Sequence, residues 1–168
     1  MTRPHPHLVA QSRINSPLGP LTAAATPLGL AGLWFDGQAH HPGPLAVPVD
    51  DHHPVLAAAA LAVAAYFDGD AEPLGRVALD LHGTPFQLAV WRALQALPRG
   101  TTATYGQIAA GVGSPAGFRA AGAAIGRNPV SILVPCHRVL GQGGALTGYA
   151  GGLHRKQALL RAEGVLPT

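Results

Sequence analysis

The stretch "TYGQIAAGVGSPAGFRAAGAAIGRN" (104–128) has the pattern of two short helices joined by a glycine-containing turn. We expect the second helix to begin with Ser114 as its N-cap and Pro115 at its first position. Two short helices joined in this way fit a helix-turn-helix. The small residues around Arg119 would let the backbone approach a DNA minor groove closely. The alternative is a small-residue helix that only packs against another helix.

Further helices are predicted on both sides of this stretch. "TPFQLAVWRALQALPRG" (84–100) opens with Thr84 as N-cap and Pro85 at the first helical position, and its helical periodicity continues to Leu97. "GGLHRKQALLRAEG" (151–164) has the pattern of a last helix that ends at a glycine. We therefore expect a mainly helical C-terminal domain over residues 83–168.

The first half of the chain has a different pattern. Short apolar stretches broken by Pro-Leu-Gly indicate hairpins, and a helix closed by Asp-Gly follows a His-, Pro- and Gly-rich loop. We expect strands near 12–15, 19–25 and 29–35, a loop over 37–53, a helix over 54–67 and one more strand in "GRVALDL" (75–81). The fold class is α+β, with an N-terminal α/β domain over residues 1–82.

Charge divides the chain at the same place. Residues 1–82 carry three basic and seven acidic residues, a net charge of −4, whereas residues 83–168 carry eight basic residues and one acid, a net charge of +7. A basic half beside an acidic half suggests that the basic half faces a polyanion. The alternative is an ordinary domain whose surface charge is lopsided.

Composition indicates an intracellular protein. The 168 residues are 48% apolar and include one cysteine, which excludes an intramolecular disulfide and a Cys-rich zinc site and suits a reducing compartment. We find no secretory signal, and the longest apolar run, 55–67, is too short to span a bilayer. We expect a cytoplasmic location, no membrane, no cofactor and no metal. The histidines of the first half lack ligand spacing, and we read them as solvent-exposed: His5, His7, His40, His41, His52 and His53.

The single cysteine follows an apolar run that we read as a buried strand, in "SILVPCHRVLGQGG" (131–144). A free cysteine is usually a small buried hydrophobic residue. However, His137 follows Cys136 directly, and a thiol needs a base or a positive neighbour to become a reactive thiolate. Neighbours on a strand point to opposite faces, so the two side chains converge only if Cys136 lies in a turn.

Glu163 is the only acid of the basic half. It lies in the last turn of a predicted helix, where a negative charge opposes the helix dipole by roughly 0.3–1 kcal/mol. A carboxylate that orients a histidine, which in turn activates a cysteine, has the logic of a catalytic triad. The alternative is a helix-end glutamate that pairs with Arg161 or another nearby base.

Taken together, "NPVSILVPCHRVLGQGGALTGYAGGLHRKQALLRAEG" (128–164) and the residues upstream of it to position 84 closely resemble the O6-alkylguanine-DNA alkyltransferases. The resemblance implies a ribonuclease-H-like N-terminal sheet with a helix and a winged helix-turn-helix-like C-terminal domain. It implies irreversible transfer of the alkyl group from O6-alkylguanine, and also from O4-alkylthymine, in duplex DNA to Cys136. The protein would be a monomer that binds the minor groove and acts once, as a methyltransferase without turnover.

The resemblance also assigns roles to residues. It implies that His137 deprotonates Cys136 through a water, that Glu163 orients His137, and that Asn128 holds the turn before the active-site segment. Nucleotide flipping would bring the base to the thiol, with one residue filling the vacated stack. The residues implied in DNA and base binding are Arg119 in the stack, Tyr105 on the guanine ring, the backbone of Val139 and Ala150 on the base, and Tyr149 and Ile125 around the alkyl group.

The chain differs from the family pattern at Phe118, where we expect a small residue. It also differs from some relatives at Ser131, where they have a proline, and at Ala150, where they have a hydroxyl residue. Three other functions stay open on the sequence. A lesion-binding module without transfer would lack the acceptor cysteine, which this chain has. A helix-turn-helix regulator would leave the Cys–His–Glu set unexplained, and a cysteine hydrolase would turn over on acyl substrates.

Overall fold

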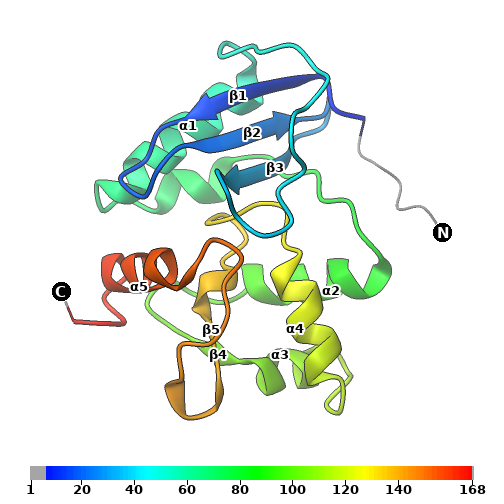
Figure 1. Ribbon diagram of the computed structural model, residues 1–168, viewed down its shortest axis with the longest axis vertical. Helices are drawn as coiled ribbons and strands as arrows, with labels where there is room; N and C mark the ends of the chain where they lie inside the picture. The colour runs from blue at the N-terminus through cyan, green and yellow to red at the C-terminus, as the bar shows by residue number, and fades with distance from the viewer. Residues whose placement is uncertain (1–6, 168) are drawn as a thin grey trace. The chain divides into compact units, whose positions relative to one another are not determined.

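The computed structural model describes residues 7–167, and the chain divides into two compact units (Figure 1). The N-terminal unit runs to His82 and also includes Pro129–Leu133. The C-terminal unit comprises Gly83–Asn128 and the chain from Val134 onward. All the candidate site residues named above lie in the C-terminal unit.

The N-terminal unit is a three-stranded antiparallel sheet covered by one helix. The strands are β1 (Ala10–Ile14), β2 (Leu21–Ala25) and β3 (Leu30–Phe35), in the order β1-β2-β3. Helix α1 (Pro54–Phe67) packs on all three (Figure 1). The three predicted strands and the predicted helix are confirmed, and residues 37–53 form the expected irregular loop.

Turn residues explain these boundaries. Gly19 donates its backbone N–H to Ser16 at 3.0 Å and has a φ of 106°, a conformation that only glycine adopts without strain. At the start of α1, the His53 side chain accepts a hydrogen bond from the Val55 N–H, and Pro54 occupies the first turn, where no N–H is needed.

The predicted strand over 75–81 is wrong. Residues Glu72–Arg76 form a 3₁₀ helix, and beyond it only one bridge joins Leu79 to Leu30. Residues 75–81 form no full strand because two short segments, 78–80 and 129–131, divide the edge of β3 that β2 leaves free. Leu33 exchanges backbone hydrogen bonds with Pro129 and Ser131, at 2.8 and 3.0 Å, so residues 78–80 pair only with the beginning of the strand.

The C-terminal unit is mainly helical. Three helices pack on one another: α2 (Pro85–Gln95), α3 (Tyr105–Gly111) and α4 (Phe118–Gly126). The Trp91 indole of α2 donates to the Ala124 carbonyl of α4 at 2.9 Å. The remaining elements are β4 (Ala103–Thr104), which pairs in parallel with β5 (Val139–Leu140), the 3₁₀ turns Cys136–Arg138 and Gln142–Gly144, and α5 (Leu153–Ala162).

The second helix of the 104–128 stretch is present, but its expected start at Ser114 is wrong. Helix α4 begins at Phe118 with Gly117 as its N-cap, and the Gly117 N–H donates to the Ser114 carbonyl at 2.8 Å. Ser-Pro favours a turn as readily as an N-cap, and here residues 114–117 close a turn before the helix.

No strand leads to the cysteine. Val130 makes a single bridge to Leu33, and the chain then turns at Ile132, which is buried with a φ of 73°. That left-handed conformation is rare for a β-branched residue and ends the pairing. Pro135 has no N–H to extend a ladder, so Cys136 lies in a turn rather than on a strand.

No helix within residues 7–167 has both the length and the apolar character that a bilayer crossing requires. The fold is thus mixed α+β, with the three-stranded sheet in the first unit, and the packed helices α2, α3 and α4 and the short β4–β5 pair in the second.

Candidate active site around Cys136

Cys136 begins the 3₁₀ turn Cys136–Arg138 and is buried. Asn128, at the end of α4, donates from its amide nitrogen to the Val134 carbonyl at 2.7 Å and also hydrogen-bonds the cysteine side chain. The Cys136 N–H donates to the same Val134 carbonyl at 2.8 Å. Asn128 therefore ties the segment that carries the thiol to the chain that follows α4.

His137 and Glu163 form a buried pair. The His137 Nε2 lies 2.8 Å from Glu163 Oε2, and neither side chain is exposed to solvent. Glu163 is the C-cap of α5, where it opposes the helix dipole. The unfavourable interaction between the Glu163 carboxylate and the helix dipole is therefore offset by the buried contact with His137.

Arg138 completes the cluster. Its Nε donates to Glu163 Oε1 at 2.7 Å and its Nη2 donates to Oε2 at 3.0 Å, while its Nη1 donates to the Leu97 carbonyl at 2.7 Å. Such a two-point guanidinium–carboxylate contact is strong and directional. Arg138 is thus a nearby base that pairs with Glu163. The sequence reasoning missed Arg138, although the lone acid of a basic half needed a cation beside it.

The protonation states follow from these contacts. Glu163 accepts two hydrogen bonds from a guanidinium, so it is ionised and His137 Nε2–H donates to it. Burial lowers the pKa of His137 below its ordinary value, although Glu163 opposes that shift. The ring is then neutral, with its proton on Nε2. The other nitrogen, Nδ1, is buried and has no hydrogen-bond partner among the described residues, so its lone pair can accept a proton.

The Cys136 thiol is neutral in the same environment. Burial raises the pKa of Cys136 above its ordinary value, against the opposing effects of the Asn128 hydrogen bond and the Lys156 charge. A neutral thiol beside a neutral imidazole is a resting state from which one proton transfer yields the thiolate.

Lys156 is a second residue that the sequence reasoning missed. It is the only lysine of the chain, it lies in α5 and its side chain is almost completely buried. Its Nζ donates to the carbonyls of Val139, Thr147 and Gly148 at 2.5, 2.9 and 3.0 Å. A lone lysine among ten arginines was a signal that the sequence offered.

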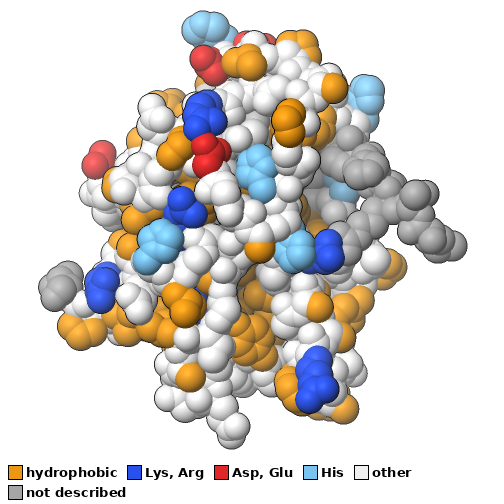
Figure 2. Space-filling model, in the orientation of Figure 1, with side chains coloured by type: hydrophobic (Ala, Val, Ile, Leu, Met, Phe, Trp, Pro, Cys, Tyr) orange, Lys and Arg blue, Asp and Glu red, His pale blue; other side chains and the backbone are white. Residues whose placement is uncertain are grey.

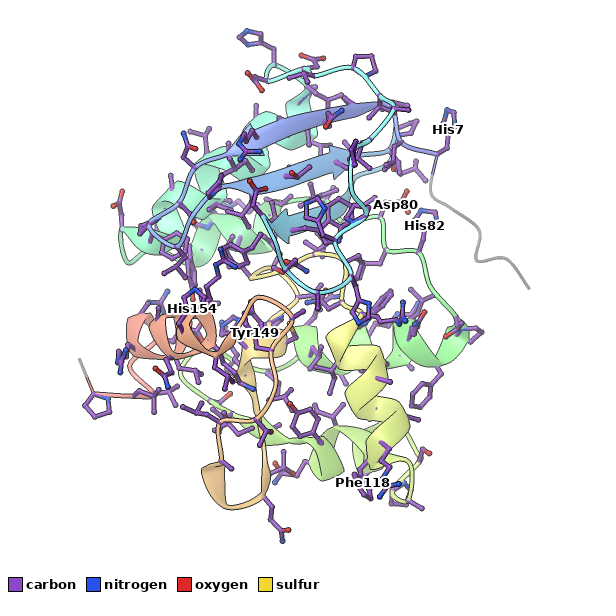
Figure 3. All side chains as sticks on the ribbon, viewed as in Figure 1. His7, Asp80, His82, Phe118, Tyr149 and His154 are labelled. Atoms are coloured by element: carbon purple, nitrogen blue, oxygen red, sulfur yellow. The ribbon has the colours of Figure 1, made fainter. Side chains whose placement is uncertain are left out.

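Tyr105 reaches the loop that precedes α5. Its hydroxyl donates to the Thr147 carbonyl at 3.1 Å, two residues before Tyr149. Figure 3 shows Tyr149 in that loop. Ala150 is half-buried, and Val139 is fully buried in β5. The candidate base-binding residues thus come from α3, β5 and one glycine-rich loop.

Helix α4 carries the most exposed of the candidate residues, Arg119. Arg119 is exposed on the first turn of α4, and its guanidinium lies 5.9 Å from the centroid of the Phe118 ring, which is 51% exposed. Figure 3 shows Phe118 at the start of that helix. Ile125, near the other end of α4, is buried. A pocket of about 450 Å³ opens beside these helices, lined by Thr104, Tyr105, Gly106, Pro115, Phe118 and Gln142.

Charge is arranged differently on the two units. On the face shown in Figure 2, the acidic side chains lie over the N-terminal unit, while basic ones are scattered. Ser131, one of the positions that differ from some relatives, belongs to the N-terminal unit and donates from its hydroxyl to Gln38 Oε1 at 3.3 Å. Within residues 7–167 no three histidine, cysteine or acidic side chains are placed to hold a metal ion, and His5 lies outside the described residues.

Known proteins have similar sequences and a similar fold. Residues 85–165 match the family model described as 6-O-methylguanine DNA methyltransferase, DNA binding domain. The methylated-DNA–protein-cysteine methyltransferase of Mycolicibacterium paratuberculosis is 42% identical over 156 residues, covering 93% of each chain. That of Mycobacterium tuberculosis H37Rv is 45% identical over 150 residues, covering 89% of each.

A crystal structure of Mycobacterium tuberculosis OGT in complex with DNA superimposes with a TM-score of 0.83 and 43% identity, covering 93% of each chain. A Methanococcus jannaschii O6-methylguanine DNA methyltransferase, 22% identical, has the same fold with a TM-score of 0.65 over 93% of this chain and 95% of that one. The chain belongs to the methylated-DNA–protein-cysteine methyltransferase family. The resemblance noted in the sequence is confirmed.

Proposed function

We propose that this protein repairs alkylated DNA by direct reversal, moving the alkyl group from O6 of guanine, or O4 of thymine, to Cys136. The observation that carries the proposal is the buried His137–Glu163 pair, whose histidine directly follows the only cysteine of the chain in the sequence. The similar chains are named methylated-DNA–protein-cysteine methyltransferases, and one related structure is a complex with DNA.

The chemistry is an in-line displacement at carbon. His137 Nδ1 accepts the Cys136 proton through a water, and Glu163 stabilises the imidazolium that forms. The thiolate then attacks the alkyl carbon. A new C–S bond forms while the C–O6 bond breaks, and the bonding electrons pass to the purine, which takes a proton in place of the alkyl group. No electrons or cofactor are needed, and the stable thioether limits each protein molecule to one reaction.

The burial of the Cys136 thiol favours this reaction in two ways. The raised pKa of Cys136 keeps the thiol neutral and unreactive toward electrophiles in general. The thiolate forms only when the neutral imidazole accepts its proton, and a thiolate shielded from water is a strong nucleophile toward saturated carbon. The site therefore combines low background reactivity with activation at the bound base.

Base recognition uses the backbone around the cysteine. The carbonyls of Cys136 and Val139 accept hydrogen bonds from the exocyclic amine of guanine, and the N–H of Ala150 donates to O6. Tyr105 donates to the ring and so helps negative charge leave the alkylated oxygen. Tyr149 and Ile125 border the alkyl group.

We propose that the C-terminal unit binds the DNA. Its net charge of +7 suits a polyanion, and α3 and α4 form a helix-turn-helix pattern. Arg119 enters the stack from the minor groove when the nucleotide flips out. We extend the proposal to the finer fold: a ribonuclease-H-like domain over residues 1–82, and a winged helix-turn-helix-like domain over residues 83–168. We also propose that the protein acts as a monomer in the cytoplasm, where a free thiol stays reduced.

The test separates binding from transfer. In the Cys136→Ala variant we expect transfer from an O6-methylguanine duplex to be abolished while affinity for the same duplex is retained. Loss of duplex binding together with transfer would mean that the cysteine is chiefly structural. Repeated turnover on acyl substrates by the wild-type protein would favour a cysteine hydrolase instead.

A further inference from the structure

The strongest feature that the proposed mechanism leaves unused is the buried ammonium of Lys156. Its side chain is 1% exposed, and the three acceptors of its Nζ are all backbone carbonyls. A buried charge is costly unless hydrogen bonds compensate it. A methionine or leucine would fill the same space without that cost, so the retained charge calls for a reason beyond packing.

The three carbonyls belong to two different parts of the site. Val139 lies in β5, three residues after Cys136, whereas Thr147 and Gly148 belong to the loop that leads to Tyr149 and Ala150. One ammonium therefore links the strand to the loop. It fixes the direction of the Val139 carbonyl relative to the loop whose Tyr149 and Ala150 are proposed to contact the alkylated base.

We propose that Lys156 is a positioning residue that orients the Val139 carbonyl toward the exocyclic amine of guanine and thereby sets the preference for guanine over purines that lack this amine. The inference rests on the proposed function and deepens it. A carbonyl oxygen has two lone pairs, so a carbonyl held by Lys156 can still accept from the base. A hydrogen bond to a cation also polarises the carbonyl in a site shielded from water.

The Tyr105 contact gives a second reason for the ammonium. In the free protein, Thr147 accepts from both Tyr105 Oη, at 3.1 Å, and Lys156 Nζ, at 2.9 Å. The tyrosine hydroxyl has one proton, which it must withdraw from Thr147 in order to donate to a bound base. Because Lys156 remains on that carbonyl, the loop keeps its anchor when Tyr105 changes partner.

The experiment compares two free-base probes that differ only in the amine: O6-benzylguanine and O6-benzylhypoxanthine. The measured quantity is the second-order rate of benzylation of Cys136, followed by intact-mass spectrometry. We expect Lys156→Met to lower the rate with O6-benzylguanine about tenfold further than the rate with O6-benzylhypoxanthine, which corresponds to one hydrogen bond. A purely structural lysine would lower both rates by the same factor.

Two further variants sharpen the comparison. Arg161→Met removes an exposed cation from the same helix and should leave the ratio of the two rates unchanged. Lys156→Gln keeps one donor group in the cavity and should show a smaller fall in the ratio than Lys156→Met. Equal losses on both probes in the Lys156 variants overturn the inference alone. A wild-type protein that accepts no alkyl group from either probe or from an O6-methylguanine duplex overturns the proposed function and this inference with it.

A spectroscopic test needs no change at Lys156. Because the chain has one lysine, ¹⁵N-lysine labelling gives a single side-chain resonance. In a Cys136→Ala protein, where no transfer occurs, we expect O6-benzylguanine to shift this resonance more than O6-benzylhypoxanthine does. Equal shifts, or none with a bound ligand, contradict the proposed contact.

Discussion

His137 Nε2 lies 2.8 Å from Glu163 Oε2, and both side chains are completely buried. The contact fixes the imidazole tautomer and leaves the lone pair of Nδ1 as the basic site of the ring. Glu163 is held in turn by two donors of Arg138. Arg138 thus contacts Glu163, which in turn contacts His137. This chain of contacts predicts what replacing Glu163 or Arg138 does to the rate of transfer and to stability.

Replacing Glu163 by glutamine tests the charge of the carboxylate. The amide oxygen can still accept from His137 Nε2, but it cannot stabilise an imidazolium. We expect the rate of transfer to fall about 100-fold, within the range of general-base effects. Single-turnover kinetics with an O6-methylguanine oligonucleotide measure it. A rate within twofold of wild type would show that His137 acts without its carboxylate.

Arg138→Met tests the buried ion pair. Removing the guanidinium takes away the cation that holds the buried Glu163 carboxylate, and breaking a buried pair typically costs about 3–5 kcal/mol of unfolding free energy. Arg76→Met is the matched control, since Arg76 pairs with Glu72 on the surface and should cost less than about 1 kcal/mol. Urea denaturation compares the two variants. Similar losses would mean that the buried pair contributes no more than a surface pair.

Arg119→Ala tests the stack-filling role. The side chain is exposed on α4, so we expect its removal to leave the free-base reaction nearly unchanged. Repair of a duplex must also include unstacking, which costs a few kcal/mol, and there we expect a loss of at least about tenfold. Rates with O6-benzylguanine and with an O6-methylguanine duplex are compared. Equal losses on the two substrates would rule out the role.

Lys156 makes a prediction about stability and pH. Burial lowers the pKa of Lys156 to about 8 from 10.5, although the nearby Cys136 opposes the shift. Between these two values the unfolded chain binds a proton that the folded protein has released. The lysine therefore makes unfolding free energy rise with pH, with the gain beginning near pH 8 and complete above pH 10.5.

In a Cys136→Ala background, which removes the titrating thiol, we expect a gain of about 1.6 kcal/mol between pH 8 and pH 9.5 relative to the same protein with Lys156→Met. Denaturation curves at the two pH values give the difference. A difference that stays constant, or that falls as pH rises, would show that Lys156 does not titrate in this window.

Local signals in the sequence predicted much of the fold. The helix starts at Pro54 and Pro85 were predictable because a proline after a capping residue needs no context from the rest of the chain. The start at Ser114 was not, since Ser-Pro fits a turn as well as a cap. The strand expected over 75–81 failed for a non-local reason: residues 129–131 occupy part of the same edge of β3.

The candidate site also contains residues that the sequence indicated and residues that it did not. Cys136, His137 and Glu163 could be singled out because each breaks a compositional or positional pattern, and the structure places His137 and Glu163 in contact. Arg138 and Lys156 were missed because their importance lies in burial. Periodicity does not predict that a cation in the first turn of α5 points inward to three carbonyls.

The measurement that tests the central claim most directly is the intact mass of the protein after incubation with an O6-methylguanine duplex. The account predicts a gain of one methyl group that saturates at one per protein molecule and maps to Cys136. No gain in mass, with duplex binding retained, would contradict transfer and indicate a protein that binds the lesion without repairing it.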